Sequence, residues 1–329
     1  MSQTPKKNSF IQIIAFMGLI TLVVLVVLML SEDKQHEGNA YDLDIDKFNQ
    51  ISPELIRYKI VQEIQVSGSK LRAVAVDSAD YIYAATESQI IKYNPYGSLI
   101  ESIDLPLDLR NLTLDDRGEI YAASKNSVYR IDRGDGTTRE IITLTDSSII
   151  TSLAVTENHL FLADAGNRIV AHFDTSGQFF KYIGGAGLEK GRPGFVIPSP
   201  FFDLAIKDQQ LWVVNPGMHR FENYAFDGRL LQSWGAHSAR LEGFCGCCNP
   251  SHFAVDANLG FVTSEKGLVR VKIYSPSGDL MAVVAGPDQF ARQATGLDIC
   301  IDSNQRILIA EPVSNTVKIF EPQLEADRD

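Results

Sequence analysis

The chain has 329 residues, of which 45% are hydrophobic and 22% charged, and its formal net charge is -11. This length and composition suffice for one large or two ordinary globular domains and exclude a disordered chain. The acidic balance and the lack of any lysine and arginine cluster exclude a nucleic-acid partner and disfavour membrane binding through basic patches.

The first predicted element is a transmembrane helix over residues 10–30. This uncharged apolar run is long enough, at 1.5 Å per residue, to cross a hydrocarbon core of about 30 Å. Two lysines precede it and acidic residues follow it, which places residues 1–9 in the cytoplasm and the remainder in the periplasm or outside the cell. A cleaved signal peptide is the alternative, but the run is long and lacks a small-x-small site, which favours an uncleaved anchor.

After this anchor, residues 31–56 are polar and acidic and are predicted to form a linker that holds the following domain off the bilayer. The short segment 323–329 at the other end is predicted to be a C-terminal tail. Between the linker and the tail, residues 57–322 contain a repeated sequence pattern.

Each copy of this repeat consists of an apolar strand, an aspartate or other polar residue, a turn and a second apolar strand. Six copies occur, and they begin at Ala73, Asn111, Ser152, Asp203, His252 and Leu297. The copies recur every 38 to 51 residues, which is the period of propeller blades, and five continue into a third and a fourth strand. Asp77, Asp115 and Asp302, which follow first strands, are predicted to cap turns.

The sixth copy lacks a fourth strand, and residues 57–66, which alternate like a strand before the first copy, are predicted to supply it. That pairing would close a ring and remove two exposed sheet edges. An open solenoid is the alternative, but it would need polar capping repeats that the chain lacks. The predicted fold is therefore an all-β, six-bladed propeller that follows one transmembrane helix.

Two of the copies resemble NHL repeats, namely DAGNRIVAHFDTSGQFFKYIGG from Asp164 and GMHRFENYAFDGRLLQSWG from Gly217. The copy around Arg270 is similar, the copy at Thr316 lacks the arginine, and the first two copies match only in general form. The resemblance implies a six-bladed propeller. It also implies that the chain belongs among proteins that are mostly binding platforms, with a minority of enzymes such as lyases.

The loop after Trp234 holds the one cysteine cluster of the sequence, Cys245, Cys247 and Cys248, with His252 and His219 as further candidate ligands. Thiolate and imidazole donors suit a metal ion or an iron–sulfur centre. The alternatives are a disulfide that staples the loop and no role. A haem attachment is excluded because Asn249 follows Cys248. Cys300 is predicted to be a small core residue.

In a four-stranded blade, the turn between the second and third strands and the linker to the next blade emerge on one face. Side chains of these segments are predicted to form a ligand-binding rim around the central channel: Asn167, Arg168, Arg220, His237, Lys266 and Arg270. The alternative for the three arginines, which hold equivalent repeat positions, is to bond backbone carbonyls between blades.

These features predict a membrane-tethered extracytoplasmic platform that binds a protein or another ligand, with a protein partner at the membrane. A non-enzymatic role is favoured because the sequence contains no recognised catalytic motif. Two alternatives stay open, a metal-binding or electron-transfer protein that uses the cysteine loop and a metal-dependent lyase or hydrolase.

Overall fold

A computed structural model describes residues 17–18, 50–187 and 193–323. The predicted N-terminus 1–9, nearly all of the predicted transmembrane helix 10–30, most of the linker and the tail after residue 323 lie outside these residues. Within the described residues, the structure contains no helix with the length and apolar character needed to cross a bilayer. The description that follows concerns the unit Ile45–Asp329.

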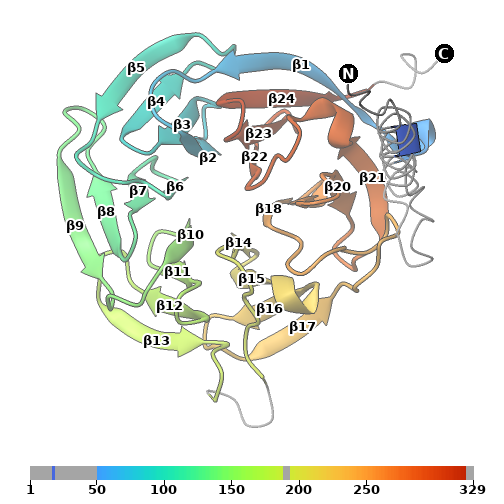
Figure 1. Cartoon of the computed structure of the whole chain (residues 1–329). Helices are drawn as coiled ribbons and strands as arrows, with labels where there is room; N and C mark the ends of the chain where they lie inside the picture. The colour runs from blue at the N-terminus through green and yellow to red at the C-terminus, as the bar shows by residue number, and fades with distance from the viewer. Residues whose placement is uncertain (1–16, 19–49, 188–192, 324–329) are drawn as a thin grey trace, which may run out of the picture. The chain divides into compact units, whose positions relative to one another are not determined.

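The described residues form six four-stranded antiparallel sheets arranged around a central axis (Figure 1), which confirms the predicted six-bladed propeller. Blade 1 comprises β2 (Leu71–Val76), β3 (Ile82–Thr86), β4 (Gln89–Tyr93) and β5 (Leu99–Asp104). Blade 2 comprises β6 (Asn111–Leu114), β7 (Ile120–Ala123), β8 (Ser127–Ile131) and β9 (Thr138–Thr143). Blade 3 comprises β10 (Ile150–Val155), β11 (Leu160–Asp164), β12 (Ile169–Phe173) and β13 (Phe179–Ile183).

The remaining blades follow the same order from the axis outward. Blade 4 comprises β14 (Leu204–Lys207), β15 (Gln210–Asn215), β16 (Arg220–Ala225) and β17 (Leu230–Trp234). Blade 5 comprises β18 (His252–Asp256), β19 (Gly260–Ser264), β20 (Val271–Tyr274) and β21 (Leu280–Ala285). Blade 6 comprises β22 (Asp298–Ile301), β23 (Ile307–Glu311), β24 (Thr316–Pro322) and β1 (Tyr58–Gln65). Within the described residues, three short 3-10 helices lie outside the sheets: η1 (Pro53–Leu55), η2 (Pro216–Met218) and η3 (Pro287–Gln289).

The ring is closed by the N-terminal strand, as the sequence predicts. β1 pairs antiparallel with β24, from Tyr58 opposite Pro322 to Gln65 opposite Thr316, with a register shift between Ile60 and Gln62. The last blade therefore contains both ends of the propeller sequence, and β24 is not left as an open edge.

The first turn of several repeats is held by its aspartate, which confirms the prediction for these residues. Oδ1 of Asp77 accepts hydrogen bonds from the backbone amides of Ala79 and Tyr81. Asp115 and Asp302 make the same pair of bonds within their own turns. A short side chain that satisfies two amides fixes a tight turn locally, so each repeat determines its own first hairpin.

The hydrophobic core lies between the blades. Six clusters of buried apolar side chains each draw on two neighbouring blades. One of them joins Ile64 and Val66, at the end of β1, to Leu71 in blade 1 and Val317 in blade 6. Because each sheet is covered on both faces, the blades stack around the axis and the innermost strands are left to line a channel.

Candidate functional site

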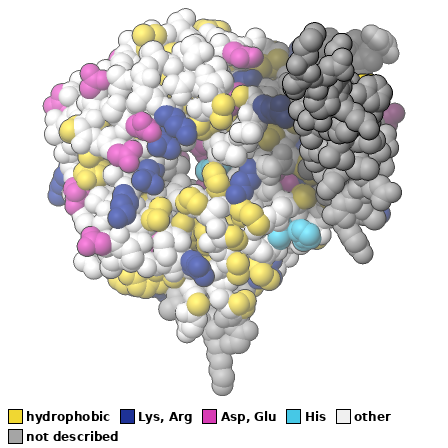
Figure 2. Space-filling model, viewed as in Figure 1, with side chains coloured by type: hydrophobic (Ala, Val, Ile, Leu, Met, Phe, Trp, Pro, Cys, Tyr) yellow, Lys and Arg dark blue, Asp and Glu magenta, His cyan; other side chains and the backbone are white. Residues whose placement is uncertain are grey.

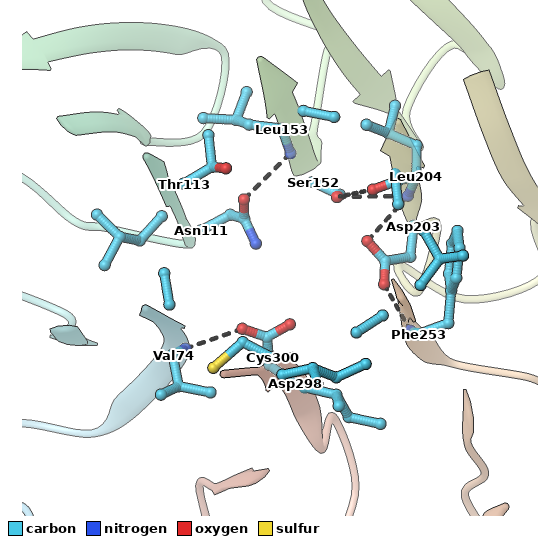
Figure 3. A pocket seen from close by; sticks show the side chains of 18 of the residues that line it. Val74, Asn111, Thr113, Ser152, Leu153, Asp203, Leu204, Phe253, Asp298 and Cys300 are labelled. Carbon is cyan, nitrogen blue, oxygen red and sulfur yellow. Dashed lines mark hydrogen bonds between the residues drawn. The ribbon is translucent and has the colours of Figure 1, made fainter. Parts of the chain in front are cut away.

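The six innermost strands surround a central cavity of about 320 Å³, shown from close by in Figure 3. Its wall is formed by β2, β6, β10, β14, β18 and β22. Cys300, predicted as a small core residue, packs against the core cluster between blades 6 and 1 and also lines this cavity from β22.

Five blades have a polar side chain at one equivalent position of the repeat, and four of these five side chains line the central cavity. We call the five side chains the polar ring, and its members are Asn111, Ser152, Asp203, His252 and Asp298. The first blade has Ala73 at this position.

Most members of the polar ring bond a backbone amide of the next blade. Asp203 Oδ2 accepts from the amide of Phe253 at 2.8 Å, and Asp298 Oδ2 accepts from the amide of Val74 at 2.9 Å (Figure 3). Asn111 accepts in the same way from Leu153 at 3.1 Å. These bonds tie neighbouring blades together at the axis.

Three members of the ring converge. Nδ1 of His252 lies 3.5 Å from an Asp203 oxygen and 3.7 Å from an Asp298 oxygen. Among the described residues, these three are the one set of histidine, cysteine and carboxylate side chains whose donor atoms all lie within 4.8 Å of one another. Nδ1 of His252 is buried and makes no hydrogen bond within the described part of the chain.

Burial and the charges of neighbouring members of the trio shift the pKa values of His252 and Asp298. Burial lowers the pKa of His252, but the two carboxylates outweigh that effect, so its pKa is raised above the ordinary value. Burial raises the pKa of Asp298 to about 6, and Asp203 adds to the rise while His252 opposes it. Two buried carboxylates and one imidazole therefore form a site that a cation would stabilise.

The spacing of the trio fits a single metal ion. Nitrogen and oxygen ligands bind such ions at about 2.0–2.2 Å, so two donors at a tetrahedral angle are about 3.4 Å apart. The His252 distances of 3.5 and 3.7 Å are close to that value. One imidazole and two carboxylates are a donor set that suits zinc, manganese or iron.

Next to the trio lies a second cavity of about 210 Å³, which we call the vestibule. His252 lines it together with the aromatic ring of Phe201 and three cationic side chains, Lys70, Arg72 and Arg110. Arg72 pairs with Glu87 at 2.6 Å, yet its Nε is buried without a hydrogen-bond partner among the described residues. Figure 2 shows lysine and arginine side chains around the central hollow of the propeller, whereas acidic side chains lie mostly toward its edge. Arg110 is paired as well, with Asp108 at 3.5 Å, so the excess positive charge that can attract an anion to the vestibule comes from Lys70.

In the structure the cysteines and His252, predicted to lie together, are in different surroundings. All four cysteines of the chain are free thiols, with Cys247 exposed, Cys248 buried and Cys245 between these extremes. Sγ of Cys247 lies 3.1 Å from Sγ of Cys248. His252, predicted as a ligand beside the cysteines, points instead to the two aspartates.

His219 does reach the cysteine loop, since its Nε2 lies 2.5 Å from the carbonyl oxygen of Gly246. Its ring also packs edge-on against His237 with centroids 4.5 Å apart. The two predicted histidines are thus together at one side of the loop.

A buried ion cluster lies beneath this loop. Arg270 and Lys272 are both 0% exposed, and both bind the buried Glu265, at 3.0 and 2.7 Å. Arg270 also donates to the carbonyl of Ala239, and Glu265 accepts from the amide of Cys245. Arg270, predicted at the rim, is therefore enclosed below the loop, and it bonds one backbone carbonyl, as in the alternative interpretation of the arginines.

The other predicted rim residues have separate surroundings. Arg168 is exposed, while Asn167 bonds Asp164 within its turn at 2.7 Å. Arg220 pairs with the buried Glu222 at 2.6 Å. Lys266 lies between the cysteine loop and the vestibule, because its Nζ donates to Ser199 at 3.0 Å and stands 4.8 Å above the Phe201 ring.

Asp203 and Asp298 are the candidate ligands that the sequence analysis missed. A signal was present, since both hold the position that His252 holds in its own copy of the repeat. Polar residues at one register position of innermost strands face one another across the axis of a closed ring.

No protein-family model and no curated protein matches this chain. Several solved structures are similar to it. A catalytically inactive His-to-Ala variant of virginiamycin B lyase from Staphylococcus aureus, solved with quinupristin, is 15% identical, with 79% of this chain and 83% of that chain covered and a TM-score of 0.55. A gluconolactonase from Xanthomonas campestris is 14% identical over 81% of this chain and 95% of that chain, with a TM-score of 0.58.

A Bacteroides thetaiotaomicron protein of unknown function is similar to the same degree, with 14% identity over 81% of this chain and 76% of that chain and a TM-score of 0.59. At such identities the likeness establishes the fold. The resemblance to NHL repeats stays a prediction.

Proposed function

We propose that this protein is a lyase or hydrolase that acts on a small anionic substrate at the mouth of its central channel, with a divalent metal ion bound by Asp203, His252 and Asp298. The observation that carries the proposal is the convergence of these three buried side chains beside a vestibule with a cationic rim. The similar structures named for a lyase and a gluconolactonase support it, and the inactive variant of the former lacks a single histidine.

In this proposal the cationic residues of the vestibule bind the substrate, and the trio carries out the chemistry. Lys70, Arg72 and Arg110 bind the anionic group of the substrate and orient it over the trio. Asp203 and Asp298 hold His252 by charge, and both are themselves fixed by amides of the next blade. A divalent ion at this position would polarise a carbonyl group or lower the pKa of a bound water.

The proposal predicts that full-length protein purified without chelator contains one divalent ion per chain. His252→Ala and Asp298→Asn should lose this ion and about 100-fold or more in kcat/KM toward an anionic lactone or ester. Ser152→Ala is the matched control, because Ser152 belongs to the polar ring but not to the trio, and it should retain the ion. Elemental analysis and a substrate panel give both readouts.

Native protein that contains no divalent ion, and whose melting temperature does not rise when zinc or manganese is added, would contradict the proposal. The trio would then serve only to join blades 4, 5 and 6 at the axis.

A second candidate function is the predicted binding platform, and exposed aromatic residues favour it. Phe179, Phe180 and Tyr182 of β13 are 40%, 46% and 46% exposed on the outer strand of blade 3. An exposed apolar patch of this kind is typical of a surface that contacts another protein. The platform proposal includes a protein partner at the membrane and is compatible with an active site at the channel.

We also propose that the propeller is extracytoplasmic and held by the apolar segment 10–30, on the strength of its length and of the charges beside it. Alkaline phosphatase fused after Pro322 should then be active in bacterial cells, because this enzyme requires an oxidising compartment. A fluorescent protein that folds only in the cytoplasm serves as the reciprocal reporter. Fluorescence of that second fusion, with an inactive phosphatase, would overturn the proposed topology.

A further inference from the structure

The cysteine loop places two thiols of unequal exposure in contact. Cys247 is exposed, whereas Cys248 is 0% exposed, and their sulfur atoms are 3.1 Å apart. Cys245 makes a different contact, since its backbone amide donates to Glu265. The three cysteines of the motif therefore resolve into an adjacent pair and one separate residue.

The buried thiol has two polar partners. The hydroxyl of Ser199 donates to Sγ of Cys248 at 3.0 Å, and Nζ of Lys266 donates to that hydroxyl at 3.0 Å. Burial raises the pKa of Cys248, but Lys266, Ser199 and Cys247 together lower it below the ordinary value. The hydrogen bond to Cys248 raises the pKa of Cys247. Of the two thiols, Cys248 is therefore the one that loses its proton more readily, although it is the one that solvent does not reach.

We propose that Cys247 and Cys248 form a thiol–disulfide exchange site whose substrate is a small external disulfide. In the first step the exposed Cys247 passes its proton to the neighbouring Cys248 sulfur and bonds, as a thiolate, to one sulfur of the external disulfide. The S–S bond of that disulfide breaks and releases a thiolate, which takes up the proton from Cys248. In the second step the Cys248 thiolate attacks Cys247 Sγ, a protein disulfide forms, and the second external thiolate leaves. The two protein thiols are oxidised and one disulfide is reduced to two thiols, which take up the two protons.

The geometry suits both steps. The external disulfide meets the exposed Cys247 sulfur, and the Cys248 sulfur already lies 3.1 Å from the sulfur that it must attack. Adjacent α carbons are about 3.8 Å apart, closer than the roughly 4.4–6.8 Å of most disulfides. The closed form is therefore strained and easily reduced, which makes the site reversible.

The test is to incubate full-length protein with oxidised glutathione and to follow thiol content, intact mass and peptide maps. Native protein should lose two thiols and two hydrogen masses, with the new bond between Cys247 and Cys248, and dithiothreitol should restore both thiols. Cys248→Ser should accumulate one glutathionyl group on Cys247, because nothing displaces it. Cys247→Ser should gain no glutathionyl group on Cys248, since that sulfur is buried.

Cys245→Ser and Cys300→Ser are the matched controls, and both should close the pair at the native rate. Lys266→Met should slow closure severalfold, whereas Lys181→Met, which removes a lysine that binds the Asp227 carbonyl in another blade, should not. Peptide mapping of the oxidised native protein locates the new disulfide, so the proposal can be tested even if a variant fails to fold. A disulfide that includes Cys245, a stable glutathionyl adduct on native protein, or four unreacted thiols would overturn the proposal.

Discussion

Replacing Glu265 by glutamine is expected to lower the free energy of unfolding by about 3–5 kcal/mol, the cost of removing one partner from a buried ion pair. Glu265 is 1% exposed and is the carboxylate that both Arg270 and Lys272 contact. Without it, two cations that are 0% exposed would lose their counter-ion.

The two cations would respond differently. Burial already lowers the pKa of Lys272 to about 8, against the opposing effect of Glu265, so without that carboxylate Lys272 can become neutral near pH 7. Arg270 cannot lose its proton, so its charge would remain buried. The main cost of the substitution therefore comes from Arg270.

Denaturant unfolding of Glu265→Gln and of native protein measures this difference. Glu119→Gln is the control, since Glu119 pairs with Arg130 at 3.2 Å where both side chains are about half exposed, and it should change stability by about 1 kcal/mol or less. Equal effects of the two substitutions would show that the cluster does not stabilise the fold.

The same cluster organises the cysteine loop. Nζ of Lys272 donates to the carbonyls of Leu241 and Gly243, and Arg270 donates to the carbonyl of Ala239. Backbone carbonyls of the loop thus accept hydrogen bonds from the two buried cations, Arg270 and Lys272, over which the loop lies. Disorder of the loop should accompany the loss of stability in Glu265→Gln.

The architecture was predictable because residues within each repeat determine the strands and the first turn of that repeat. Alternating apolar residues define the strands, and a residue such as Asp115 fixes the following turn through its neighbours in sequence. The missing fourth strand of the last copy, together with the alternating segment 57–66, was enough to predict how the ring closes.

The candidate site was less predictable because it is assembled across blades. Asp203, His252 and Asp298 are 49 and 46 residues apart in sequence, and only closure of the ring brings their side chains together. Sequence proximity instead associated His252 with Cys248, four residues before it. Its side chain points to the axis because it begins an innermost strand, whereas the cysteines lie in the preceding linker.

Arg270 illustrates a second limit. Its repeat position predicted a place at the rim, but residues of the long linker that follows blade 4 fold over it. The path of such a linker depends on buried polar contacts specific to this blade, and a repeat pattern does not encode them.

Deleting residues 1–66 is expected to abolish the cooperative unfolding transition of the whole propeller. The deletion removes β1 and so exposes β24 along its length, and it also removes Ile64 and Val66 from the cluster between blades 6 and 1. An exposed edge of this kind pairs readily with other chains, so the truncated protein should aggregate.

A milder change tests the same closure without removing the strand. Ile64 is 5% exposed and Val61, on the same strand, is 43% exposed. Ile64→Ala should lower the free energy of unfolding by about 2–5 kcal/mol, whereas Val61→Ala should lower it by about 0.5 kcal/mol or less. Thermal and denaturant unfolding should show one transition in each variant, because the blades depend on one another around a closed ring. A separate early transition confined to blade 6 would instead mean that β1 seals only a local edge.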